Sequence, residues 1–190
     1  VFDGTKHVPY QEDDEPNAIN AYGRSKLAGE RLVRETLAEH SIVRTAWLYG
    51  LGGDHFVERV LRRAAEGGAL VGVTDETATP TWTRGLAQAL ARLIETRRYG
   101  IYHLTNAGEA SRYEWVQEIV RLAELDAGAR PVTAVEFRAS LPPGTLAPAK
   151  PPYSVLANEA AARLGIELRP WREALREYFA ARSAPRPSEG

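Results

Sequence analysis

Tyr22 and Lys26 are the two residues whose types and spacing most clearly suggest chemistry. They are four positions apart, so in a helix both side chains project from one face, about 5–6 Å apart at Cβ. A phenol gives up its proton poorly near neutral pH, and a neighbouring ammonium group stabilises the phenolate. A tyrosine assisted in this way can protonate a carbonyl oxygen while a hydride reaches the carbonyl carbon. The pair alone is a weak signal, because exposed tyrosines and solvated lysines are common on surface helices.

The pair lies near the start of a predicted helix. Residues 20–39 contain no proline and are rich in Leu, Ala, Glu and Arg, and Asn20 is a favourable N-cap. The polar, turn-rich residues 5–18 predict a surface loop before this helix. The β-branched and aromatic run from Ile42 to Tyr49 predicts a buried strand after it.

Helices and strands are predicted to alternate along the remaining sequence. Apolar residues at helical spacing predict helices around 56–64, 86–94 and 112–122, the last capped by Ser111, and closing helices near 156–164 and 170–182. Strands are predicted over 70–73 and 100–106 and, more weakly, over 132–137, whereas the proline-rich residues 139–153 should be irregular. This alternation predicts an α/β fold, the C-terminal part of a Rossmann-type doubly wound parallel sheet plus a smaller substrate-binding lobe.

Composition excludes several classes of protein. The 190 residues are 44% apolar and 26% charged, with a net charge of −1, which argues against a disordered chain and leaves no electrostatic signature for nucleic acid or membrane. The absence of cysteine excludes disulfides, thiolate zinc sites and a cysteine nucleophile. No apolar run approaches the ~20 residues of a membrane helix, and no secretory signal is present. We therefore expect a soluble, cytoplasmic protein.

The first residues suggest that sequence is missing upstream. Val1-Phe2-Asp3-Gly4 resembles the end of a strand followed by a turn, and the chain contains no methionine. Only two or three buried parallel strands are predicted, too few for a doubly wound sheet. We therefore expect these residues to be the C-terminal part of a longer protein.

Seven stretches, taken in order, carry a family resemblance. They are Val1–Lys6, Pro9–Asp14, Ala21–Glu30, Arg44–Gly50, Thr79–Thr83, Gly100–Asn106 and Pro151–Leu156. Together they resemble the dTDP-4-dehydrorhamnose reductases, a family of the extended short-chain dehydrogenase/reductase superfamily. Because they cover nearly the whole chain, they are far more specific than the Tyr–Lys pair.

The resemblance implies an activity and a role for three residues. The activity is NADPH-dependent reduction of the C4 carbonyl of a 6-deoxyhexose carried on dTDP, the last step towards dTDP-L-rhamnose; NADH stays open as the cofactor. Tyr22 is implied as the proton donor and Lys26 as the residue that holds the nicotinamide ribose, so both are predicted to be catalytic and cofactor-binding. Trp47 falls where the family places a tryptophan against the sugar, although a core aromatic at a strand end is an equally good interpretation.

His55 and Lys150 complete the predicted substrate-binding residues. His55 stands where the family usually has Asn and can donate to a phosphate or a base, although a histidine with a purely structural role is the more common case. Lys150 replaces the usual Arg before proline and can meet a diphosphate as a point charge, or be solvated. No metal site is predicted, because the acidic run 12–15 is typical of a solvated turn and the histidines lack ligand spacing.

Other functions and the assembly stay open. A nucleotide-sugar epimerase or dehydratase of the same superfamily uses the same Tyr–Lys pair, and a regulatory subunit of the methionine adenosyltransferase type keeps the fold without catalysis. Residues 1–50 and 79–105 are predicted to belong to the cofactor-binding domain, 51–78 and 106–182 to the substrate-binding lobe, and 183–190 to a disordered tail. The predicted partner is a dTDP-sugar; a homodimer is compatible with such enzymes, but nothing in the sequence decides it.

Overall fold

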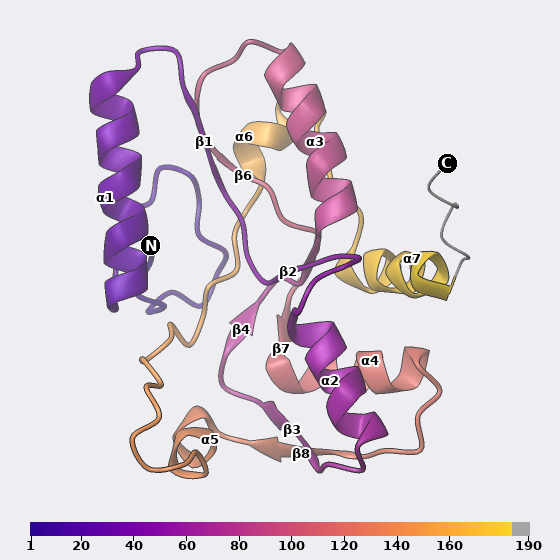
Figure 1. Ribbon diagram of the computed structural model, residues 1–190. Helices are drawn as coiled ribbons and strands as arrows, with labels where there is room; N and C mark the ends of the chain where they lie inside the picture. Colours follow the sequence, from indigo (N-terminus) through magenta and orange to yellow (C-terminus); the bar gives the residue numbers. More distant parts are fainter. Residues whose placement is uncertain (184–190) are drawn as a thin grey trace.

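Helices alternate with short strands in the computed structural model, which describes residues 1–183 (Figure 1). The helices are α1 (Ala21–Thr36), α2 (Phe56–Ala65), α3 (Thr83–Glu95), α4 (Arg112–Leu122), α5 (Ala134–Ala139), α6 (Glu159–Ala162) and α7 (Trp171–Ser183). The strands are β1 (Ser41–Arg44), β2 (Leu48–Tyr49), β3 (Leu70–Val73), β4 (Thr77–Ala78), β5 (Thr81–Trp82), β6 (Gly100–His103), β7 (Ala110–Ser111) and β8 (Ala129–Val132). The predicted α/β class is confirmed.

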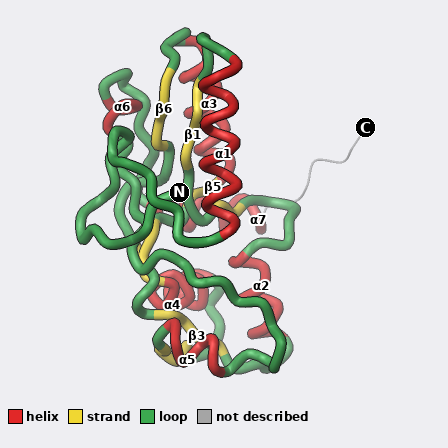
Figure 2. The backbone as a smooth tube through the Cα atoms, turned by 90° about the vertical axis from the view of Figure 1, so that its left-hand side faces the viewer, coloured by secondary structure: helices red, strands yellow, loops and turns green. Residues whose placement is uncertain are grey.

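The strands form four two-stranded pairs. β1 runs parallel to β6, with Ser41 opposite Gly100 and Arg44 opposite His103. β2–β5 and β3–β8 are also parallel, whereas β4–β7 is antiparallel. The helices α1 and α3 lie on opposite sides of the β1–β6 pair, and α2, α4 and α5 surround β3–β8 in the lower part of the molecule (Figures 1 and 2).

Two main apolar cores stabilise these layers. The larger joins α2, α4 and α7 around Trp115, which has no exposed surface, and the second joins α3, β6 and α6.

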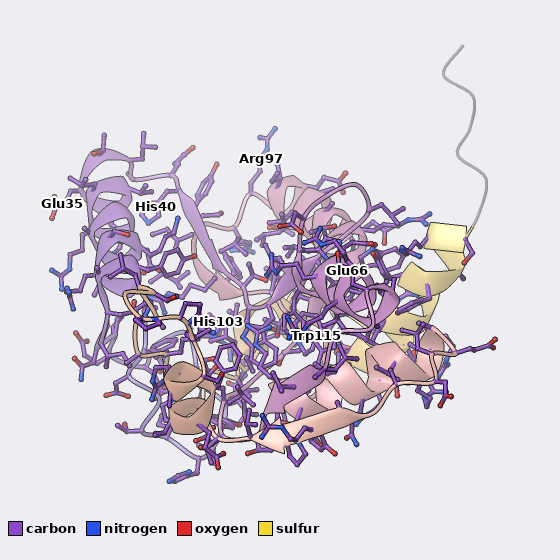
Figure 3. The ribbon with its side chains drawn as sticks, turned by 60° about the horizontal axis from the view of Figure 1, so that its bottom comes forward. Glu35, His40, Glu66, Arg97, His103 and Trp115 are labelled. Carbon is purple, nitrogen blue, oxygen red and sulfur yellow. The ribbon has the colours of Figure 1, made fainter. Side chains whose placement is uncertain are left out.

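His103 is also fully buried, and its Nδ1 lies 3.1 Å from the carbonyl oxygens of Tyr10 and Ala157. Figure 3 shows Trp115 and His103 inside the molecule, whereas Glu35 and Arg97 project from its surface. Burial lowers the pKa of His103, so its ring is neutral in the folded protein at neutral pH.

One predicted strand is divided in two. The expected strand over 42–49 is interrupted after Arg44, because Trp47 adopts a φ of 42°, a left-handed conformation that interrupts an extended strand. β1 therefore pairs with β6, while β2 turns away to pair with β5. This interruption places Trp47 between the two strand pairs.

The weakly predicted strand over 132–137 is wrong for most of its length. The strand ends at Val132, and α5 begins two residues later. Thr133 and Glu136 form a reciprocal capping box, in which each side chain accepts the backbone N–H of the other residue. These two bonds satisfy N–H groups at the start of the helix and favour a helical turn over a strand.

The end of the chain differs in part from the prediction. Ser183, expected in a disordered tail, is the last residue of α7, and the rest of that predicted tail, 184–190, lies outside the described residues. No helix within residues 1–183 is both long enough and apolar enough to cross a membrane.

Candidate active site and substrate pocket

A cavity of about 520 Å³ lies beside the N-terminal half of α1. Three of the predicted site residues, Tyr22, Lys26 and Trp47, line it together. The remaining lining comes from the first two residues, the loop before α1, other residues of α1, the end of β1 with the two residues after it, and the segment 151–156. The cavity therefore brings together segments that lie far apart in the sequence.

The start of α1 sets the direction of Tyr22 and Lys26. Asn20 caps the helix as predicted: its Oδ1 accepts the backbone N–H of Gly23 at 2.8 Å, and its Nδ2 donates to the carbonyl oxygen of Ala149 at 2.9 Å. Lys26 Nζ lies 5.3 Å from the centre of the Tyr22 ring, so the two side chains share one helix face, as the four-residue spacing predicts. Tyr22 is 71% exposed, which leaves its hydroxyl accessible to a ligand.

A buried ion pair joins α1 to the strand beneath it. Arg44, on β1, donates from Nε at 2.9 Å and from Nη2 at 2.7 Å to the two carboxylate oxygens of Glu30. The two side chains are only 8% and 12% exposed, and the guanidinium also lies over the ring of Phe2. The pair fixes the middle of α1 against the wall of the cavity.

Trp47 separates this first cavity from a second one of about 540 Å³, and it lines both. Its ring stacks on Trp115 at 5.4 Å between centres, with only 8° between the planes. Trp47 lies in the irregular segment between β1 and β2. The backbone carbonyl oxygen of Trp47 accepts a hydrogen bond from the backbone N–H of Thr81. Trp47 is thus packed against the core and also lines both cavities, and its contact with a sugar stays a prediction.

The second cavity contains the other two predicted substrate-binding residues, His55 and Lys150. Lys150 is 53% exposed, and its Nζ lies 3.5 Å from a carboxylate oxygen of the buried Glu76. His55 precedes α2 without capping it, and both of its ring nitrogens are buried with no hydrogen-bond partner within residues 1–183. A polar ring in that state has unused capacity to bind a polar ligand.

Sequence reasoning missed one cation of the second cavity, Arg112. It is the first residue of α4, and its guanidinium carbon lies 3.6 Å from the centre of the Trp47 ring. Burial lowers the pKa of Arg112 to about 10, so it remains charged at neutral pH. The predicted cap at Ser111 places Arg112 in the first turn of a helix. Nothing in the neighbouring sequence indicates that the Arg112 side chain would line a cavity.

The acidic and histidine side chains of the described residues do not gather into a cluster. Nowhere in the range 1–183 do three His, Asp or Glu side chains converge as metal ligands. In the acidic run, Asp14 instead pairs with Lys6, and the pKa of Asp14 is lowered chiefly by that hydrogen bond.

Comparisons with known proteins show what the chain as a whole is similar to. A family model described as the RmlD substrate binding domain matches residues 1–183. The spore coat polysaccharide biosynthesis protein SpsK of Bacillus subtilis (strain 168) is 40% identical over 184 residues, covering 97% of this chain and 62% of that protein. A dTDP-4-dehydrorhamnose reductase of Burkholderia thailandensis is 40% identical over 187 residues, covering 92% of this chain and 62% of that protein.

Solved structures agree with these relatives. The crystal structure of dTDP-4-dehydrorhamnose reductase (rfbD) from Bacillus anthracis str. Ames in complex with NADP matches with a TM-score of 0.88 and 35% identity, covering 95% of this chain and 62% of that one. This likeness confirms the predicted Rossmann-type α/β fold. The UDP-glucose 4-epimerase of Thermotoga maritima, at a TM-score of 0.72 and 16% identity, shares the fold alone. The chain spans about three fifths of the length of the proteins that it matches.

Proposed function

Because this chain belongs to the family of the RmlD substrate binding domain, we propose that the protein reduces the C4 carbonyl of a 6-deoxyhexose carried on dTDP, with NADPH as the reductant. The observation that carries the proposal is the meeting of Tyr22, Lys26 and Trp47 around one cavity. Support comes from the relatives: several are named dTDP-4-dehydrorhamnose reductases, and one of the solved structures is a complex with NADP.

The chemistry requires one hydride and one proton. NADPH, when bound, supplies the hydride to the carbonyl carbon. Tyr22 donates its hydroxyl proton to the carbonyl oxygen, so that the C=O double bond becomes a CH–OH group. Lys26 stabilises the phenolate that remains, and water restores the proton to Tyr22 through the open side of the cavity. Atoms and charge then balance: the ketone gains a hydride and a proton.

The residues of the first cavity fit a ligand that carries hydroxyl groups. Lys26 makes no ion pair or hydrogen bond within residues 1–183, so its three N–H donors are free for a ribose. The hydroxyl group of Thr45, which also lines this cavity, is buried and has no hydrogen-bond partner within residues 1–183. We propose Tyr22 and Lys26 as the nicotinamide-ribose site, with NADPH preferred to NADH by analogy with the relative bound to NADP.

The two cavities suggest how the substrate is divided. We propose that the keto-sugar occupies the first cavity against Trp47 and that the nucleotide diphosphate extends into the second, towards His55 and Lys150. The predicted division into a cofactor-binding domain (1–50 and 79–105) and a substrate-binding lobe (51–78 and 106–182) stays a prediction. The two separate cores favour it, although α6, from the second range, packs in the core of the first.

Because the chain spans about three fifths of the length of its relatives, the test uses the full-length protein: the oxidation of NADPH in the presence of the dTDP-linked 4-keto-6-deoxyhexose, with identification of the reduced sugar. Tyr22→Phe keeps the ring beside Lys26 and removes only the hydroxyl group. We expect it to lower kcat by about 10²- to 10⁴-fold, because proton donation is lost, with little change in substrate affinity.

Tyr99→Phe is the matched control. The hydroxyl group of Tyr99 is bonded to Glu39 on the surface, so its loss should leave kcat unchanged. Equal turnover by the Tyr22→Phe variant and the parent protein would remove Tyr22 from the role of proton donor. Absence of NADPH oxidation with this substrate would overturn the proposed activity.

A further inference from the structure

The second cavity contains a cation, Arg112, that has no ion-pair contact with any described residue. Of the cations that line it, Arg59 lies 3.6 Å from a carboxylate oxygen of Asp54, and Lys150 pairs with Glu76. The guanidinium of Arg112 forms no ion pair and no hydrogen bond with any residue of 1–183. The three cations of the lining therefore outnumber its two carboxylates by one, and Arg112 interacts with the carboxylate of Glu76 only from a distance.

Aromatic rings hold this guanidinium in place. Its central carbon lies 3.6 Å from the centre of the Trp47 ring, 4.7 Å from that of Phe56 and 5.3 Å from that of Trp115. Stacking on ring faces uses the flat face of the guanidinium and leaves the N–H donors around its edge free. The result is a planar donor group of fixed orientation at the border between the two cavities.

Fold stability alone does not explain an arginine at this position. Burial disfavours the charged guanidinium, as the lowered pKa of Arg112 shows. Arg112 is also the first residue of α4, where the helix dipole opposes a positive charge, and the capping box of Ser111 and Glu114 is complete without it. A methionine would fill the same space between the rings with no charge to desolvate.

We infer that Arg112 is a specificity-determining residue of the substrate pocket, whose guanidinium edge binds a phosphate group of the sugar nucleotide while its face rests on Trp47. The inference rests on the proposed function, which supplies the ligand class. A guanidinium presents paired donors that match two phosphate oxygens, and this geometry favours a phosphate over a neutral group. Because Trp47 lines both cavities, a phosphate at Arg112 would place the attached sugar next to the cavity of Tyr22.

The inference is tested by calorimetric titration of the protein with dTDP and, separately, with thymidine, which has no phosphate. Arg112→Met keeps the aliphatic packing and removes the charge. We expect it to weaken dTDP binding by about 10- to 100-fold and thymidine binding by less than about threefold. Arg112→Lys, which keeps the charge but not the planar fork, should lie between Arg112→Met and the parent protein.

Arg62→Met is the matched control, since Arg62 lies on the neighbouring helix α2, is 57% exposed and is paired with Asp54, but is outside the lining of this cavity. It should change dTDP affinity by less than about threefold, and it should leave most of the salt dependence of binding in place. Arg112→Met should flatten that salt dependence, a change that a purely structural role of Arg112 would not produce.

Each contrary result has a definite meaning. Equal weakening of dTDP and thymidine binding by Arg112→Met would show a packing role and overturn the inference. Equal effects of Arg62→Met and Arg112→Met would show a general effect of positive charge near the cavity instead of a phosphate contact. Failure of the parent protein to bind dTDP would overturn the inference as well. The titration contains no NADPH and no keto-sugar, so a protein that binds dTDP through Arg112 but does not oxidise NADPH would refute the proposed reduction alone.

Discussion

Replacing Glu30 by Gln leaves a buried guanidinium without its counter-ion, and the structure sets the size of the effect. Arg44 is 8% exposed, its Nε and Nη2 both donate to the Glu30 carboxylate, and its Nη1 already lacks a partner. Breaking such a buried pair from one side typically costs about 3–5 kcal/mol, and the carbonyl oxygen of Gln retains part of one contact. We expect Glu30→Gln to lower the free energy of unfolding by about 2–4 kcal/mol.

Urea unfolding measures this loss directly. With a slope of about 2 kcal/mol per molar urea, typical of small domains, the midpoint should fall by about 1–2 M. Glu118→Gln is the matched control: its partner Arg121 is 60% exposed, so the orphaned guanidinium is solvated and the cost should stay below about 1 kcal/mol. The double variant Glu30→Met/Arg44→Met, which removes both charges, should recover most of the stability. A midpoint for Glu30→Gln equal to that of Glu118→Gln would refute the reasoning.

Two further predictions concern close packing and pH. In Gly72→Ala the new Cβ would lie 2.4 Å from the Cα of Tyr113, so α4 must move away from β3. Thermal unfolding should show that the free energy of unfolding falls by about 1–3 kcal/mol. Gly128→Ala is the control and should show no such loss, because no described atom lies within 4 Å of its new Cβ. The pKa of Glu58 is lowered chiefly by its hydrogen bond from Arg182, and Tyr178 donates to the same carboxylate. A folded-state pKa below the unfolded value means that this stabilisation is present above the unfolded pKa of about 4.3 and is lost as the pH falls through the folded pKa. The stability difference between the parent protein and Glu58→Gln should therefore shrink in acid, and a difference that is constant from pH 7 to pH 3 would contradict the assignment.

The features that could be predicted from the sequence depend on residues close together along the chain. The cap at Asn20 bonds to Gly23, and the cap at Ser111 bonds to Glu114, three residues away in each case. Tyr22 and Lys26 share one helix, so their common face follows from helix geometry once the helix is identified. The box formed by Thr133 and Glu136 has the same local character, although a weak strand is predicted from the sequence over 132–137.

The remaining features depend on contacts between distant segments. The backbone of Trp47 is left-handed because the chain changes partner there: β1 pairs with β6, and β2 pairs with β5. No residue near Trp47 in the sequence predicts this conformation. Arg112 becomes part of a cavity because α4 packs against β3, where Gly72 permits the close approach. A single sequence shows that Arg112 begins a helix, but only Trp115, on the same helix, is a local contact of its guanidinium; Trp47 and Phe56 come from distant segments.

The position of the phenol of Tyr22 depends on directional polar contacts more than on apolar burial. Within α1 only Gly23 is buried, so apolar packing does little to fix the rotation of the helix about its axis. That rotation is set by Asn20 at one end and by Glu30 about 15 Å further along, with Tyr22 and Lys26 between them. Hydrogen bonds have preferred directions, so these two contacts keep one face of the helix towards the cavity. Apolar contacts alone would let the helix rotate about its axis. Loss of the Glu30 contact should therefore reduce turnover under conditions in which the protein is still folded. The helix would stay in position, but its rotation about its axis, and with it the direction of Tyr22, would no longer be fixed.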